Sequence, residues 1–276
     1  MQSVNFKNWC QELRTKGHTL GEISIITSRP KTTVYFHVRN MPLTKKLLEK
    51  IKNIRINSIR GRGPKRGKSL LGYRYKKFNR WTPSLVNLVA HMLFDGAIKR
   101  EGVLYYNRSP VLLENFKSKM AIIYNGKPKV YKSNDGVMRF AYHNVELGDF
   151  FITKSSRLLD DITKLPINFK LEFLKAFFDD EGSVDFRGMK RRIKGYQHND
   201  RILYLVHELL GNFKINSFVD SRFHEILVTR KENIERFAKE INFSRGIRVN
   251  GKRSNSVWRK SIEKRKILSN LLASYR

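Results

Sequence analysis

The fold of this chain is decided by the stretch LKAFFDDEGSV, which spans residues 174–184. Its apolar side chains, with Leu171 just before it, recur every three or four residues, which is the spacing of one helical face. The pair Glu181-Gly182 ends that pattern, and a strand-like run over residues 183–187 follows at once. The stretch therefore predicts an apolar helix that ends in an acid and passes directly into a strand.

A second stretch of the same design, LVAHMLFDGAI, occupies residues 88–98. Its acid, Asp95, precedes Glu181 by 86 residues (181 − 95). After each stretch come a second strand-like segment, a helix, two short strands and another helix. We therefore predict an α+β fold over residues 81–276, built from two copies of an αββαββα unit, with halves at 81–166 and 167–276.

The second copy shows its elements most clearly. We expect strands over residues 183–187, 192–197, 216–223 and 226–230, and helices over residues 201–212 and 232–241. The tail from residue 245 is dense in Lys and Arg. It predicts a basic helix over about residues 256–274 that either lies on a phosphate backbone or covers the sheets.

The charge of the chain points to a polyanionic partner. Its 276 residues include 56 Lys and Arg against 24 Asp and Glu, a net charge of +32. A membrane surface would favour a basic amphipathic helix or tail, whereas here the basic residues run through the whole chain, which favours nucleic acid. One cysteine, Cys10, excludes a disulfide framework, and no long uncharged run predicts a membrane span. We expect an intracellular, cytoplasmic protein with no membrane association.

The first 53 residues predict three short helices. Thr19 and Glu22 form a capping box at the start of the second, and Pro30 lies in the first turn of the third. The third helix presents to solvent Lys31, Thr32, Thr33 and Tyr35. This arrangement is typical of a helix-turn-helix, and it resembles those of site-specific recombinases and many archaeal regulators. A three-helix packing domain without a DNA role is the alternative.

Residues 54–80 predict a basic linker, because GRGPKRGK over residues 61–68 has almost no apolar side chain with which to form a core. The candidate DNA contacts in this linker are Arg60, Arg62, Lys65 and Arg66. Such a segment either lies in a minor groove, where the negative potential is strong, or serves as a solvated spacer.

The two acids predict a compensating cation. Each ends a helix at its negative pole, where a carboxylate is disfavoured by about 0.3–1 kcal/mol. If the two helices pack side by side, Asp95 and Glu181 meet and repel each other unless a proton or a metal ion intervenes. Mg²⁺, a hard cation that prefers oxygen ligands, suits such a site, and Mn²⁺ is an alternative. Beside a phosphodiester it would activate water and stabilise the leaving oxygen.

Both stretches resemble the LAGLIDADG motif of homing endonucleases, and the resemblance extends over residues 81–276. It implies that the two motif helices form the central interface of a pseudo-dimer, with two antiparallel sheets forming a saddle that enters the major groove. Asp95 and Glu181 then occupy the metal-binding position of the family. Asn107 and Gln197 fall near its water-ordering polar position.

Basic residues near the site complete the implied machinery. We consider Lys154, Lys164, Lys260 and Lys264 for the family's basic group, and expect Lys164 and Lys260 to supply it. Predicted strands and turns add candidate DNA contacts at Arg100, Lys132, Arg139, Arg187, Arg192 and Lys194. A solvated sheet face would carry the same residues.

The chain also departs from the motif. Ala90 and Ala176 keep one small residue in each helix, but Phe94 and Asp180 replace the other. Leu93 stands where the motif has a polar residue, whereas Asp179 keeps that polarity. We therefore expect an asymmetric or looser helix interface, with weak, strand-biased or lost cleavage as an alternative to full activity.

These features favour a single-chain, monomeric, sequence-specific endonuclease that cuts double-stranded DNA with Mg²⁺. A LAGLIDADG and helix-turn-helix regulator that binds DNA without cutting it is the second hypothesis. The third is a maturase that binds intron RNA.

Overall fold

The computed structural model describes residues 2–54, 78, 80–251 and 258–275. The chain divides into two compact units, Met1–Gly72 and Tyr73–Arg276. None of the helices in these described residues is long and apolar enough to cross a membrane.

The N-terminal unit is built from short helices: α1 (Gln2–Thr15), α2 (Leu20–Ile26) and α3 (Lys31–Val38), with residues 45–54 also helical. Helix α2 begins with the expected capping box, in which the Thr19 side chain accepts from the Glu22 N–H and the Glu22 carboxylate accepts from the Thr19 N–H. The first three helices enclose a small core of Cys10, Leu13, Ile23, Val34 and Val38.

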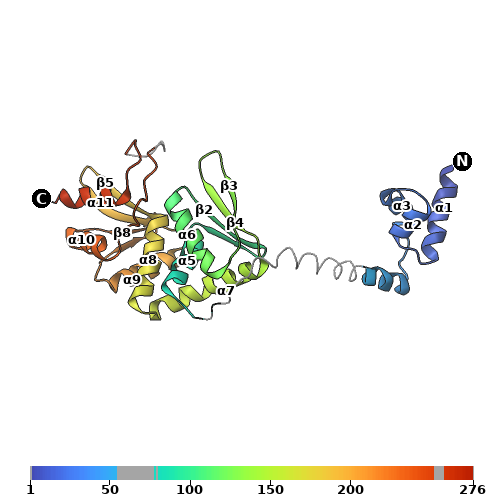
Figure 1. The fold of residues 1–276 in the computed structure, drawn as a ribbon, viewed down its shortest axis with the longest axis horizontal. Coiled ribbons are helices and arrows are strands. Elements are labelled where there is room, and N and C mark those ends of the chain that lie inside the picture. The colour runs from blue at the N-terminus through green and yellow to red at the C-terminus, as the bar shows by residue number, and fades with distance from the viewer. Residues whose placement is uncertain (1, 55–77, 79, 252–257, 276) are drawn as a thin grey trace. The chain divides into compact units, whose positions relative to one another are not determined.

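The second unit repeats one order of elements twice (Figure 1). The first copy consists of α5 (Pro83–Phe94), β1 (Gly96–Lys99), β2 (Gly102–Asn107), α6 (Pro110–Ile123), β3 (Lys129–Lys132), β4 (Met138–Tyr142) and α7 (Val145–Asp161). After the 3₁₀ turn η1 (Ile162–Lys164), the second copy consists of α8 (Ile167–Glu181), β5 (Gly182–Arg187), β6 (Lys190–Tyr196), α9 (Asp200–Gly211), β7 (Phe218–Asp220), β8 (Glu225–Val228) and α10 (Lys231–Glu240). A last helix, α11 (Lys264–Ala273), follows.

Each copy forms an antiparallel four-stranded sheet of the same order, β1-β2-β4-β3 and β5-β6-β8-β7. The predicted α+β fold with two antiparallel sheets is therefore confirmed. Helices α5 and α8 pack against each other at the centre of the unit, between the two sheets (Figure 1). Most of the buried side chains of this unit belong to one continuous core that includes these helices.

The interface of the two central helices is asymmetric but closely packed. Phe94 of α5 lies edge-on against Phe173 and Phe177 of α8, with ring centroids 5.5 and 5.3 Å apart. Ala90 and Ala176 are fully buried, as the small positions of the motif require. The expected asymmetry is present, whereas the alternative of a looser interface does not fit this packing.

Both central helices pass into a strand at a glycine that tolerates no side chain. A Cβ atom on Gly96 would lie 2.4 Å from the Met92 carbonyl oxygen, and one on Gly182 would lie 2.3 Å from the Phe178 carbonyl oxygen. Such approaches are far inside van der Waals contact, so only glycine allows the chain to leave the helix this sharply. The acid before each glycine is thereby held at the base of the sheet.

Two expected elements differ from the sequence prediction. Strand β7 is shorter than the predicted 216–223 because residues 221–224 form a turn, with His224 at a positive φ of 51°. The C-terminal helix begins at Lys264 and not near residue 256, because Arg248 and Glu263 form a β-bridge and the Val249 N–H donates to the Ile262 carbonyl. Residues 252–257 of that prediction lie outside the described residues. Helix α11 packs on β5, so it covers a sheet.

Candidate active site

Asp95 and Glu181 lie at the C-terminal ends of the two central helices, Asp95 directly after α5 and Glu181 as the last residue of α8. Both are partly buried. The side-chain amide of Asn107, at the end of β2, donates to Asp95 Oδ2 at 2.8 Å. The charge of Asp95 acts on Glu181, so helix packing brings the two acids together.

Burial and repulsion raise the pKa of both acids towards or above neutrality. Burial raises the pKa of Asp95 to about 7, and the negative charge of Asp180 raises it further. Burial likewise raises the pKa of Glu181 to about 8, with added repulsion from Asp95 and Asp180. A hard divalent cation would replace the protons and relieve the repulsion.

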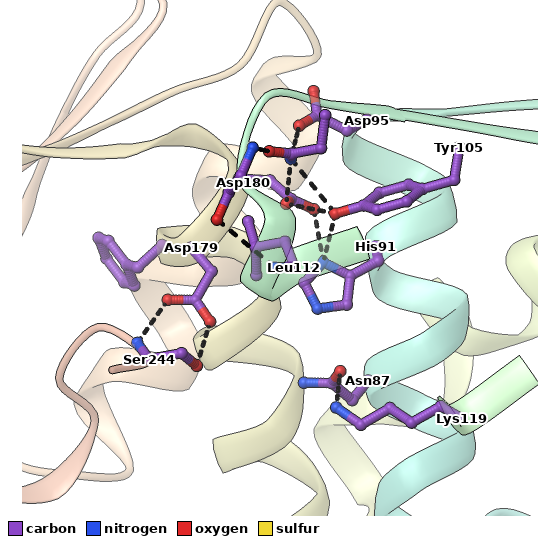
Figure 2. Close-up of polar contacts among 12 residues, drawn as sticks. Asn87, His91, Asp95, Tyr105, Leu112, Lys119, Asp179, Asp180 and Ser244 are labelled. Carbon is purple, nitrogen blue, oxygen red and sulfur yellow. Dashed lines mark hydrogen bonds and ion pairs between the residues drawn. The ribbon is translucent and has the colours of Figure 1, made fainter. Parts of the chain in front are cut away.

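A third acid, Asp180, lies next to the pair and is held by side chains from the other half (Figure 2). His91 Nδ1 lies 2.7 Å from Asp180 Oδ2, and the Tyr105 hydroxyl donates to Asp180 Oδ1 at 3.0 Å. The Asp180 side chain is 0% exposed and that of His91 3%. Asn107 also donates to Asp180 Oδ1, at 3.4 Å, and thus bridges Asp180 and Asp95.

Lys264, the first residue of α11, supplies a buried cation beneath the acids. Its Nζ donates to the carbonyl oxygens of Asp179 at 2.9 Å and of Phe178 at 3.4 Å, at the end of α8. Burial lowers the pKa of Lys264, while the surrounding acids act in the opposite direction. The Asp179 carboxylate accepts from the Ser244 N–H at 2.8 Å and from its hydroxyl at 2.5 Å. These contacts tie the C-terminal segment to the end of α8.

An open cleft of about 790 Å³ gives access to this cluster. One wall comes from the first half, and the other from residues 246–251 and 259–261 of the C-terminal segment. Its lining includes Asp95, Asn107, Asp180, Lys260 and Lys264. The cleft therefore combines carboxylates with basic side chains, a combination suited to a metal ion and a phosphate group.

The two carboxylates fit a cation whose remaining coordination positions are filled by water and substrate. In the described part of the chain, no cluster of three or more His, Cys, Asp or Glu side chains is arranged to hold a metal ion. Asp95 and Glu181 would therefore supply two carboxylates, and water and phosphate oxygens would complete the shell. Mg²⁺ is commonly bound in this way, through one or two carboxylates plus substrate phosphates.

The raised pKa values predict a pH-dependent stability without metal. A carboxyl whose pKa is raised in the folded state lowers the stability of the fold as pH rises. The loss begins near pH 4, the pKa of the unfolded-state carboxyl, and continues to the folded-state pKa of about 7 or about 8. We expect each of the two acids to lower the stability of the metal-free protein by about 2–4 kcal/mol between pH 5 and 8. Denaturant unfolding across that range, compared between the protein and its Asp95→Asn variant, measures the effect. An identical pH slope in the two proteins would contradict it.

The structure separates the other predicted catalytic residues. Lys260 lines the cleft, but Lys164 ends η1 at the opposite end of α8, roughly 20 Å away for a helix of 15 residues. That distance contradicts the expectation that Lys164 acts at the site. Lys264, another of the candidate lysines, lies beside the acids instead. Gln197 follows β6 at the position that matches Asn107, yet its side chain accepts from the Asn199 N–H at 3.4 Å and, in the described residues, makes no hydrogen bond to Glu181.

The predicted DNA contacts of the second half share one face of their sheet, opposite the core. Strand register places Arg187, Arg192 and Lys194 on this face. Arg192 Nε donates to Asp185 Oδ2 at 2.8 Å, and Lys194 pairs with Glu225. Arg187 ends β5 and is exposed. The basic groups of this sheet are therefore held partly by carboxylates.

The first half places its predicted contacts less uniformly. Arg139 lies on the outer face of its sheet, with its guanidinium 4.1 Å from the centre of the Tyr131 ring. Arg100 lies in the exposed turn between β1 and β2. Lys132 shares the register of Met138 and Asn107, which puts it on the core side at the exposed end of the edge strand.

In the N-terminal unit, α3 exposes the four predicted contacts, Lys31, Thr32, Thr33 and Tyr35. The same helix buries Val34 and Val38 against α1 and α2. The linker candidates Arg60, Arg62, Lys65 and Arg66 lie outside the described residues.

Sequence reasoning missed His91, Tyr105 and Asp180 as parts of the site. The sequence marks Asp180 only as a departure from the motif, where it replaces a small residue. His91 shows no metal-ligand spacing that would single it out. Lys264 is one of the four candidate lysines, and nothing in its local sequence distinguishes it from the other three.

Residues 168–242 match the family model described as a LAGLIDADG-like domain. The match runs from α8 to α10 and so spans the second copy of the duplicated unit. This chain therefore contains a LAGLIDADG-like domain, within an α+β fold of two antiparallel four-stranded sheets.

Among solved structures, the chain is similar to mesophilic variants of the homing endonuclease I-DmoI, with 15% identity and a TM-score of 0.46 over 59% of this chain and 92% of that one. I-DmoI in complex with DNA and Mn gives 16% identity and a TM-score of 0.44, over 59% and 97%. Full-length DUF199/WhiA from Thermatoga maritima gives 12% identity and a TM-score of 0.49, over 73% of this chain and 63% of that one. No curated protein sequence matches the chain.

Proposed function

We propose that this chain is a monomeric, sequence-specific endonuclease that hydrolyses double-stranded DNA with Mg²⁺ or a similar divalent ion. The observation that carries the proposal is the pairing of Asp95 and Glu181 at the ends of two packed helices. Burial and repulsion from neighbouring carboxylates raise the pKa of both carboxyls. Such a pair gains from a hard cation. The net charge of +32 suits a phosphate backbone as the partner.

In this proposal, Asp95 and Glu181 hold the metal ion, and the chain positions the phosphodiester around it. Such an ion, when bound, would supply a more acidic water and stabilise the developing charge on the leaving oxygen. Asn107, fixed between Asp95 and Asp180, orders water at the site. Lys264 compensates the negative charge of the cluster from below, and Lys260 in the cleft wall contacts phosphate. The outer sheet faces carry the base and backbone contacts.

The N-terminal unit extends the recognition site. Helices α2 and α3 are joined by a short turn, and the start of α3 exposes small polar and basic side chains suited to base edges and phosphates. We assign this unit the role of a helix-turn-helix that binds a flank of the DNA site.

The proposal is tested by cleavage selection on a randomised duplex DNA library with Mg²⁺, in parallel with Ca²⁺. A long consensus that is cut with Mg²⁺ and only bound with Ca²⁺ is the expected result. An enriched sequence that is bound but cut under neither condition would instead make the protein a non-catalytic regulator. Tighter binding to folded intron RNA than to duplex DNA in a competition assay would point to the maturase role.

Arg192 is expected to read one base pair. Its Nε is engaged by Asp185, and in the described residues its two terminal amino groups have no protein hydrogen bond, which leaves them free for guanine O6 and N7. We expect Asp185→Asn or Arg192→Lys to reduce discrimination at one position by about 1–3 kcal/mol. Arg187→Lys, on the same face, is expected to leave the preferred sequence intact. Binding to duplexes with single substitutions, measured without metal, separates these outcomes, and unchanged discrimination in both variants would refute the role of Arg192.

A further inference from the structure

The duplication allows the two sides of the site to be compared position by position. Register pairs Gly96 with Tyr105 in the first sheet and Gly182 with Gly195 in the second. Tyr105 thus corresponds to Gly195, and Asn107 to Gln197. Along the motif helices, Phe177 takes the place of His91, and Asp180 that of Phe94.

One side of the site is a connected polar network. His91 and Tyr105 hold Asp180 from two directions, at 2.7 and 3.0 Å. The Asn107 amide lies within 3.3 Å of the Tyr105 hydroxyl and donates to Asp95 at 2.8 Å. The Asp180 side chain is 0% exposed, although the residue borders the cleft, and its oxygens are already engaged by these contacts. Its role is to fix Tyr105 and Asn107, and through Asn107 to orient Asp95.

The equivalent positions on the other side are apolar. A Cβ atom at Gly195 would lie 2.3 Å from the Phe177 ring, so that ring fills the space that corresponds to the Tyr105 side chain. Phe177 also packs on Phe94, with ring centroids 5.3 Å apart. Among the described residues, the Gln197 side chain has one hydrogen bond, from the Asn199 N–H, and no such network reaches it.

We propose that the two strands are cut at unequal rates, and that the faster cut is the one beside Asp95 and Asn107, with Asp180 and Tyr105 as positioning residues. This rests on the proposed endonuclease function. A polar group held by several hydrogen bonds is already in its reactive orientation, whereas one in an open turn must be ordered at each cycle. The first half, whose motif match is the weaker of the two, thus has the more firmly held polar group.

The test uses duplexes labelled on one strand or the other, with the full chain and Mg²⁺. We expect the two strands to differ by about 10-fold or more in cleavage rate. Tyr105→Phe removes only the hydroxyl that holds Asp180, and should slow the faster cut about 10-fold with the slower cut within about 2-fold. Tyr142→Phe removes a buried hydroxyl from the neighbouring strand β4 and should change neither rate.

Equal rates on the two strands, or equal slowing of both by Tyr105→Phe, would overturn this inference and leave the endonuclease intact. Absence of cutting on either strand, with tight binding retained, would reject the proposed function together with the inference. General damage to the fold would slow both cuts alike, so the ratio of the two rates separates positioning from stability.

A second readout needs neither metal nor DNA. Side-chain amide protons of Asn107 and Gln197 can be followed by NMR in the free protein. We expect the Asn107 amide to exchange with water about 10-fold or more slowly than that of Gln197, because it is held by three hydrogen-bond partners. Tyr105→Phe should reduce that difference, and Tyr142→Phe should not. Equal exchange of the two amides in the unaltered protein would overturn the inference.

Discussion

Replacing Asp95 by Asn, or Glu181 by Gln, is expected to abolish DNA cleavage and to leave DNA binding nearly unchanged. Each change keeps the size of the side chain but removes the negative charge that would hold a divalent ion. Loss of a metal ligand at the reacting phosphate removes several kcal/mol of transition-state stabilisation, so we expect cleavage to fall by about 10³-fold or more. Binding relies on the spread of positive charge over the chain and should change by less than about 3-fold.

Single-turnover cleavage and metal-free binding to the selected duplex measure the two quantities separately. Glu208→Gln, an acid-to-amide change at an exposed position of α9, is the matched control and should cleave like the unaltered protein. The Asp95→Asn protein should also be more stable than the unaltered one at pH 8, because a buried repulsion is removed. Full cleavage by both variants would eliminate the proposed mechanism.

Breaking the His91–Asp180 pair is expected to produce the largest loss of stability at any single contact of the site. His91→Leu removes the contact at 2.7 Å to the buried Asp180 carboxylate and leaves its Oδ2 without a hydrogen-bond partner in the described residues, which should cost about 3–5 kcal/mol. The double variant His91→Leu/Asp180→Leu removes both polar groups. Its loss of unfolding free energy should be smaller than the sum of the two single losses by at least about 1 kcal/mol.

Urea unfolding of the four proteins at one pH gives this interaction energy. Ile234→Val, in the buried face of α10, which packs on α11 and not closely on α5, provides a combination with His91→Leu that should be additive within about 0.5 kcal/mol. Additivity of His91→Leu with Asp180→Leu as well would mean that the two side chains do not act as a pair.

Much of the fold follows from local sequence signals. The spacing of apolar residues along each motif helix, ended by an acid and a glycine, predicted both central helices and the strands that follow them. The second-copy helices were placed within one residue at each end, at Asp200–Gly211 and Lys231–Glu240. These signals are local because helix periodicity and chain reversal depend on residues only a few positions apart. Sequence also placed Asp95 and Glu181 at the ends of these helices, since each directly precedes a motif glycine.

The partners of these residues were decided only by the tertiary structure. His91 and Asp180 are 89 residues apart in the chain, and Lys264 and Asp179 are 85 apart. No periodicity connects such positions, because their proximity depends on how α5, α8 and α11 pack together in space. The C-terminal helix shows the same limit, since its composition suited either a phosphate backbone or a sheet, and packing of Ile267, Leu268 and Leu271 decided for the sheet. Sequence alone thus determined which acids end the central helices, whereas the three-dimensional packing of distant segments determined which histidine, tyrosine and lysine surround them.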